Sequence, residues 1–225
     1  MNNKWLVRLP ALTGAIFPIV GFIRGGGDEA APTDSSSGQQ IAAYAFRHGI
    51  PSPIFHIELW AFVSIVVFTL VIYSRLRPAE PGYAVAAQVA VAACVISIGI
   101  KLGSFPATYA LYSSSVQLDP GVARSLWVLG SFAFTVSMLV QALSLAAVAT
   151  SGLLFGGIPR WLAGAAGVIA VAMVPGFMLG GNFQVAPTLA WFLWMLVASV
   201  TLFVQAPRSE RVSRAAQRNM VAGTV

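Results

Sequence analysis

Charged side chains are scarce in this sequence, and their scarcity excludes several classes of protein. Of the 225 residues, 9% are charged and 57% are hydrophobic, and the mean hydropathy is +0.80. A soluble domain carries roughly 25% charged residues, so this chain cannot cover a globular surface with polar groups. A cytosolic enzyme, a nucleic-acid-binding domain and a disordered scaffold are therefore excluded. The length fits one domain, residues 1–225, in a membrane.

Cysteine and histidine are nearly absent, which limits metal and redox chemistry. The chain holds one cysteine, Cys94, and two histidines, His48 and His56. One cysteine cannot form an intrachain disulfide, and two histidines argue against a histidine-rich di-iron desaturase or a bis-histidine haem helix. The sequence also lacks a glycine-rich nucleotide loop, a G-x-S-x-G elbow, an H-E-x-x-H motif and an acidic pair inside an apolar segment. We therefore expect neither a metal nor a cofactor.

Long apolar stretches dominate what is present, and six of them approach the length of about 20 residues that spans a bilayer as a helix. They cover residues 5–23, 53–74, 83–105, 120–150, 160–179 and 187–204. Asp119 is the expected N-cap of the fourth, and Pro175-Gly176 predicts a break or kink in the fifth. The first could instead be a signal peptide, but no A-x-A-like cleavage site follows it. The sequence predicts an all-α, six-span membrane bundle.

The distribution of lysine and arginine predicts the orientation of these spans. With both termini in the cytoplasm, most basic residues lie on the inner side, including the basic tail at residues 206–225. The basic residues left on the outer side are Arg24, Arg47, Lys101 and Arg124. We therefore expect a multi-pass protein of the cell membrane, with residues 24–52 as an outer loop.

This outer loop contains the signature of a short helix. Ser37 and Gln40 have the spacing of a capping box, in which each side chain bonds the backbone N–H of the other residue. We expect a helix after Ser37 that presents Tyr44 and His48 on one face with Ile41 and Ala45, and that ends at Gly49. The helix is either a lid over a cavity or a segment that rests at the membrane interface.

Ionisable residues inside membrane spans are costly and are candidates for function. Glu58 lies near the start of the second span and Lys101 near the end of the third. Because the two helices run antiparallel, both residues lie at similar depth in the outer half of the membrane. His56 and Asp119 lie near the same depth and complete our candidate catalytic set. The alternative is an ion pair between Glu58 and Lys101 that only joins two helices.

Aromatic and polar residues gather in the same outer half. Aromatic faces stabilise cations, so they suit a dry cavity in which a carboxylic acid protonates a lipophilic substrate. An interfacial aromatic belt explains many of them without any function. The candidate substrate-binding residues are Trp60, Phe62, Phe105, Tyr109, Tyr112, Trp127, Phe177, Asn182 and Gln184.

Three segments carry a resemblance to known proteins. They are RLPALTG at residues 8–14, IAAYAFRHG at residues 41–49 and IPRWLAG at residues 158–164. The layout resembles small six-helix actinobacterial membrane proteins of unknown function, which implies a bacterial source. In size, hydropathy and an intramembrane carboxylate it is also similar to integral-membrane terpene cyclases of meroterpenoid and indole-terpenoid pathways. That similarity implies an acidic proton donor, with Asp119 or Asp28 in place of the usual second acid.

Three functions remain open from the sequence. The first is a membrane-bound terpene cyclase, a lyase or isomerase of isoprenoid biosynthesis, in which Glu58 donates a proton while Lys101 and His56 tune or orient it. The second is a non-catalytic accessory or lipid-binding protein, and the third is a small transporter. The expected partners are a lipophilic small molecule and membrane lipid, with no nucleic acid. Small-residue faces, such as Gly99 with Gly103 and the run at residues 163–167, allow close helix contact, and we expect them to serve packing within the chain; a homodimer through such faces is a further alternative.

Overall fold

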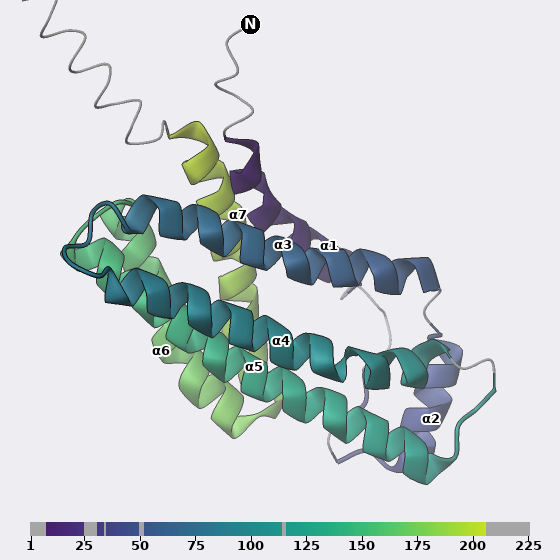
Figure 1. Cartoon of the computed structure of the whole chain (residues 1–225). Helices are drawn as coiled ribbons and strands as arrows, with labels where there is room; N and C mark the ends of the chain where they lie inside the picture. Colours follow the sequence, from purple (N-terminus) through teal and green to yellow (C-terminus); the bar gives the residue numbers. More distant parts are fainter. Residues whose placement is uncertain (1–7, 25–30, 34, 50–51, 114–115, 206–225) are drawn as a thin grey trace, which may run out of the picture.

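The computed structural model describes residues 8–24, 31–33, 35–49, 52–113 and 116–205, and this part of the chain is helical without strands. The basic tail at 206–225 lies outside the described residues. Figure 1 shows the helices as a bundle with one short helix set across an end. The elements are η1 (Leu9–Ala15), α1 (Ile16–Arg24), α2 (Gly38–Arg47), α3 (Ser52–Leu76), α4 (Val85–Ser113), α5 (Pro120–Leu154), α6 (Arg160–Leu179), η2 (Gly181–Gln184) and α7 (Val185–Val204).

Five of these helices are long and apolar enough to cross a membrane, namely α3 to α7, and the apolar segment Leu9–Ile23 is a shorter sixth. The all-α bundle of about six helices predicted by the sequence is therefore confirmed. The first span is not a uniform α-helix, because it begins with the 3-10 helix η1. It packs between α3 and α7, so the bundle partly shields this short segment.

Most ends of the long helices agree with the sequence, but the end of α4 does not. Asp119 is the N-cap of α5, and its Oδ1 atom accepts hydrogen bonds from the backbone N–H groups of Gly121 at 2.8 Å and Val122 at 3.2 Å. The predicted bounds of α6 are confirmed, and the helix continues through Pro175 without a break. In contrast, α4 does not end near Phe105 but continues through Pro106 to Ser113.

The helices α4 and α5 form the most extensive helix pair of the bundle. Small residues line their interface, and serine side chains bond across it. Ser97 Oγ donates to the carbonyl oxygen of Ser137, and Ser144 Oγ donates to that of Ala90, each at 2.7 Å. Such bonds stabilise helix pairs in a medium that offers no competing water.

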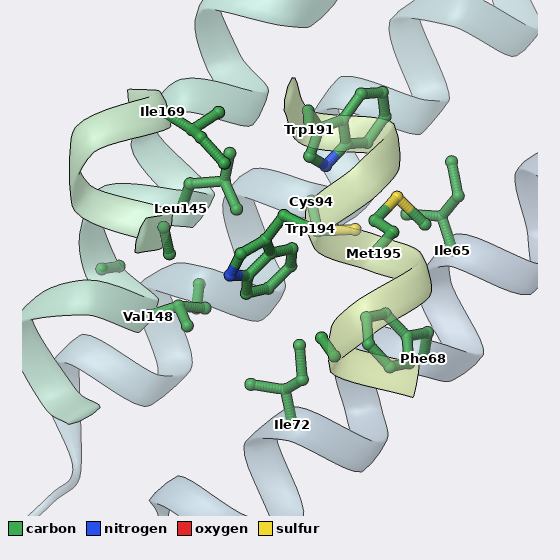
Figure 2. Packing of buried hydrophobic residues seen from close by; sticks show 14 of the residues in the cluster. Ile65, Phe68, Ile72, Cys94, Leu145, Val148, Ile169, Trp191, Trp194 and Met195 are labelled. Carbon is green, nitrogen blue, oxygen red and sulfur yellow. The ribbon is translucent and has the colours of Figure 1, made fainter. Parts of the chain in front are cut away.

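The middle of the core is formed by α7 packed against α3, α5 and α6. Figure 2 shows Trp191, Trp194 and Met195 of α7 between Ile65, Phe68 and Ile72 on one side and Leu145, Val148 and Ile169 on the other. The indole Nε1 of Trp194 donates to the carbonyl oxygen of Leu162 at 2.9 Å. This bond satisfies a polar group that would otherwise be costly inside the bundle.

The short helix α2 forms as predicted and packs on the bundle. Gln40 N–H donates to Ser37 Oγ, and Ser37 N–H donates to Gln40 Oε1, so the capping box is complete. The C-cap is His48 rather than the predicted Gly49. Figure 1 shows α2 across the far ends of α4 and α5. Its buried face, Ile41 with Ala42 and Ala45, packs against Leu111 and Ala123.

The glycines Gly99 and Gly103 do not bring helices of this chain together. A Cβ atom added at either position would meet nothing within 4 Å, so the expectation that they serve packing within the chain is wrong. The small residues of α6 do serve packing within the chain. Ala163 of α6 lies against Gly152 of α5, where an added Cβ would be only 2.7 Å from the Cβ of Ala163. The close approach of α5 and α6 therefore requires small residues there.

Candidate functional site

A cavity of about 310 Å³ lies between α3, α4 and α5, near the end of the bundle covered by α2. Its size is at the lower end of the roughly 300–1,000 Å³ found for small-molecule sites. Its wall combines a carboxyl group, an ammonium group, hydroxyl groups and apolar side chains. The lining residues are Glu58, Lys101, Thr108, Leu111, Tyr112, Leu126, Trp127, Gly130, Ser131 and Phe134.

The cavity brings together the two ionisable residues that the sequence placed inside the spans. Glu58 comes from the second turn of α3 and Lys101 from the middle of α4, and both are half-buried. The Nζ atom of Lys101 lies 4.7 Å from the ring centroid of Phe134. An ammonium group over a ring face is stabilised by the ring quadrupole, so α5 helps to hold Lys101 beside the cavity.

The remaining wall combines polar groups with apolar surface. Thr108, Tyr112 and Ser131 supply hydroxyl groups. Trp127 also lines the cavity, and its buried Nε1 has no hydrogen-bond partner among the described residues. Leu111 supplies apolar surface, together with Leu126 and Phe134. The arrangement suits a lipophilic molecule that also carries a group able to exchange a proton or accept a hydrogen bond.

The two other candidate catalytic residues lie outside this lining. His56 precedes Glu58 by two positions on α3 and is exposed. Residues two apart on a helix do not share a face, which explains why only Glu58 turns toward the cavity. Asp119 is also exposed, and its carboxylate caps α5. The site thus contains one carboxyl group, that of Glu58, among the described residues.

The candidate aromatic residues divide into three groups. Tyr112 and Trp127 line the cavity. Trp60 is 69% exposed and faces away from the bundle. The others pack in aromatic pairs within the bundle. These pairs are Phe62 with Phe17 and with Phe105, Phe105 with Phe55, Tyr109 with Phe55, and Phe177 with Phe134.

Two candidate polar residues lie in or beside η2, at the junction of α6 and α7. The main-chain oxygen of Gln184 accepts a hydrogen bond from Thr188 Oγ1 at 2.7 Å, and Gln184 is not part of the cavity lining. Asn182 belongs to η2, but its side chain lies outside the described part of the structure. Neither residue therefore contributes to the site as described.

Sequence reasoning missed several residues of the lining. They are Thr108, Leu111, Leu126, Gly130, Ser131 and Phe134. A signal for most of them was present in the helical spacing. Lys101 and Thr108 are seven residues apart on α4, and Trp127, Ser131 and Phe134 follow an i, i+4, i+7 pattern on α5. Extending one helix face from Lys101 to the candidate residue Tyr112 would have found Thr108.

The helix α2 supports the cavity from outside. Leu111, Tyr112, Leu126 and Trp127 line the cavity and also belong to the cluster that α2 packs against. These four side chains thus form a layer shared by α2 and the site. Docking of α2 therefore supports one wall of the cavity.

Nothing in the described part of the chain points to a metal site, because no group of three or more His, Cys, Asp or Glu residues lies together there. No protein family model, curated protein or solved structure matches the chain. The lining residues can transfer one proton, stabilise a charge and offer apolar surface to a lipophilic molecule.

Proposed function

We propose that this chain is a membrane-embedded enzyme that acts on a lipophilic, isoprenoid substrate by acid–base catalysis in the cavity between α3, α4 and α5. The observation that carries the proposal is the convergence of Glu58 and Lys101, from two different helices, on one cavity with an apolar and aromatic wall. Inside a membrane span such residues are rare and costly, which favours a role in function.

The proposed reaction uses Glu58 as the proton donor. Its carboxyl O–H transfers the proton to one carbon of a substrate double bond. The π electrons form the new C–H bond and leave a positive charge on the other carbon. A second double bond of the same molecule attacks that carbon and closes a ring, and loss of a proton from the resulting cation to the Glu58 carboxylate completes the cycle. No oxidant or reductant is needed.

Other residues of the lining support this step. The Lys101 ammonium stabilises the Glu58 carboxylate that forms after proton transfer, because opposite charges interact strongly in an apolar site. The ring of Trp127 borders the cavity, where its face can stabilise a carbocation. The hydroxyl groups of Tyr112 and Ser131 can orient a polar end of the substrate.

The test measures transfer of solvent hydrogen into carbon. Purified protein in liposomes is incubated in D₂O with a panel of long-chain isoprenoid olefins, and the products are analysed by mass spectrometry. The Glu58 proton exchanges with solvent, so the product gains deuterium on carbon. Removing a general acid typically costs about 10²–10⁴-fold in rate, and we expect a loss of this size in Glu58→Gln.

A matched control is Glu80→Gln, which makes the same chemical change at a carboxylate outside the cavity lining. We expect its turnover per folded molecule to equal that of the wild type. The proposal is wrong if no substrate gains deuterium in a Glu58-dependent manner. Retention of both fold and membrane insertion without any turnover would favour the non-catalytic lipid-binding alternative.

A further inference from the structure

A second, much smaller cavity lies in the middle of the bundle, apart from the Glu58 site. Its volume is about 10 Å³, and it is lined by residues of α3, α5 and α7 in the region shown in Figure 2. Most of its wall is apolar, including Trp191, Trp194 and Met195. Three polar side chains also border it, namely Thr69 of α3 and Gln141 and Ser144 of α5.

Gln141 makes this cavity unusual. The residue is 3% exposed, and its Oε1 atom is buried without a hydrogen-bond partner among the described residues. An unsatisfied buried acceptor destabilises the fold, because it has lost its hydrogen bonds to water and gained none in return. Neither lipid nor the apolar neighbours can supply a donor at this depth. The arrangement requires a donor that enters the cavity.

We infer that the cavity beside Gln141 binds one water molecule, which donates a hydrogen bond to Gln141 Oε1. A water molecule needs a cavity of roughly 10–15 Å³ and two to four polar partners. The cavity meets the first requirement with its volume of about 10 Å³ and the second with Gln141, Thr69 and Ser144.

The two hydroxyl groups are available as acceptors for the second hydrogen of this water. Thr69 Oγ1 donates to the carbonyl oxygen of Ile65 at 2.9 Å, and Ser144 Oγ donates to that of Ala90 at 2.7 Å. Each hydroxyl oxygen keeps lone pairs that can accept. The water therefore bonds to α5 and can bridge it to α3, two helices that make few direct contacts.

X-ray radiolysis tests this inference, because hydroxyl radicals formed from a bound water oxidise the side chains beside it. Met195 lines the cavity and is 1% exposed, whereas Met173 is 0% exposed and does not line it. Methionine reacts readily to its sulfoxide. In the full-length protein in liposomes, irradiated in H₂¹⁸O, we expect ¹⁸O to enter Met195 several-fold faster than Met173.

Two variants complete the design. Gln141→Met removes the acceptor, so we expect the Met195 rate to fall to that of Met173. The control Ser97→Ala removes a buried hydroxyl that already bonds to the carbonyl oxygen of Ser137, and it should leave the ratio of the two rates unchanged. Equal rates at Met195 and Met173 in the wild type would overturn the inference. This readout does not depend on any catalytic activity.

Discussion

The carboxylate of Glu80 shows how a single charged residue can hold two spans together. It lies in the loop between α3 and α4, where its oxygens accept hydrogen bonds from the backbone N–H groups of Ala86 at 2.8 Å and Ala87 at 3.1 Å. Ser151 Oγ of α5 donates to the same carboxylate at 2.8 Å. Glu80 thus accepts hydrogen bonds from backbone N–H groups in the first turn of α4. Its negative charge also interacts favourably with the positive end of the α4 dipole. Through Ser151, the same carboxylate links α4 to the end of α5.

We expect Glu80→Gln to lower the free energy of unfolding by about 1–3 kcal/mol, the usual cost when a charge-assisted bond is lost and its buried partners are left unpaired. Thermal unfolding in detergent measures the change. Ser151→Ala should lower stability less, and it should have little further effect when Glu80 is already replaced, because both substitutions break the same contact. Strictly additive effects, or an unchanged melting temperature for Glu80→Gln, would contradict this role.

At the level of single residues, the sequence predicted backbone capping better than side-chain direction. Asp119 and Ser37 act as the caps that their spacing indicated, because capping depends on a few neighbouring residues. Trp60 and Phe62 were assigned the same role, yet Trp60 is 69% exposed and Phe62 is 3% exposed. In spans that are apolar on all sides, no polar face marks which side of the helix turns inward.

At the level of helices, the continuation of α4 past Phe105 could not be read from the local sequence. A proline inside a helix normally weakens it because it lacks a backbone N–H, and Pro106 directly follows the expected end at Phe105. The structure continues to Ser113 because Leu111 and Tyr112 of this extra segment pack against α2 and α5. Tertiary packing outweighs the local cost, and it creates one wall of the cavity.

The docking of α2 depends on a glycine at its first position. A Cβ at Gly38 would collide with the backbone carbonyl of Pro120 at the start of α5. We therefore expect Gly38→Ala to loosen α2, which hydrogen–deuterium exchange would detect as faster exchange at residues 40–47. The control is Gly99→Ala, where an added Cβ meets nothing within 4 Å. Wild-type exchange of α2 in the Gly38→Ala protein would show that the contact does not hold α2 in place.

For the whole molecule, the sequence predicted the depth of the site but not its full lining. The antiparallel course of the spans was enough to place Glu58 and Lys101 at one level. The cavity also depends on how far each helix is rotated about its axis, and that rotation comes from packing. Ser131 and Phe134 of α5 line the site for this reason. The charged residue nearest to them in the sequence is Arg124, so the local sequence does not indicate a site there.

The orientation in the membrane can be measured directly. In a Cys94→Ala background, Tyr83→Cys and Val116→Cys place single thiols in the loops at opposite ends of α4, at positions 88% and 67% exposed. The excess of arginine on one side predicts that Val116 lies outside and Tyr83 in the cytoplasm. A membrane-impermeant maleimide should label Val116→Cys in intact cells and Tyr83→Cys only after lysis. The reverse pattern would show that the orientation is inverted.

The central claim is that Glu58 and Lys101 form a catalytic site rather than a structural ion pair. Its most direct test is the D₂O assay applied to the wild type, Glu58→Gln, Lys101→Met and the double variant, with turnover and melting temperature measured on the same samples. We expect Glu58→Gln and the double variant to remain folded and to lose turnover by at least about 100-fold. Full turnover in Glu58→Gln, or single variants that unfold while the double variant is stable and active, would contradict the claim.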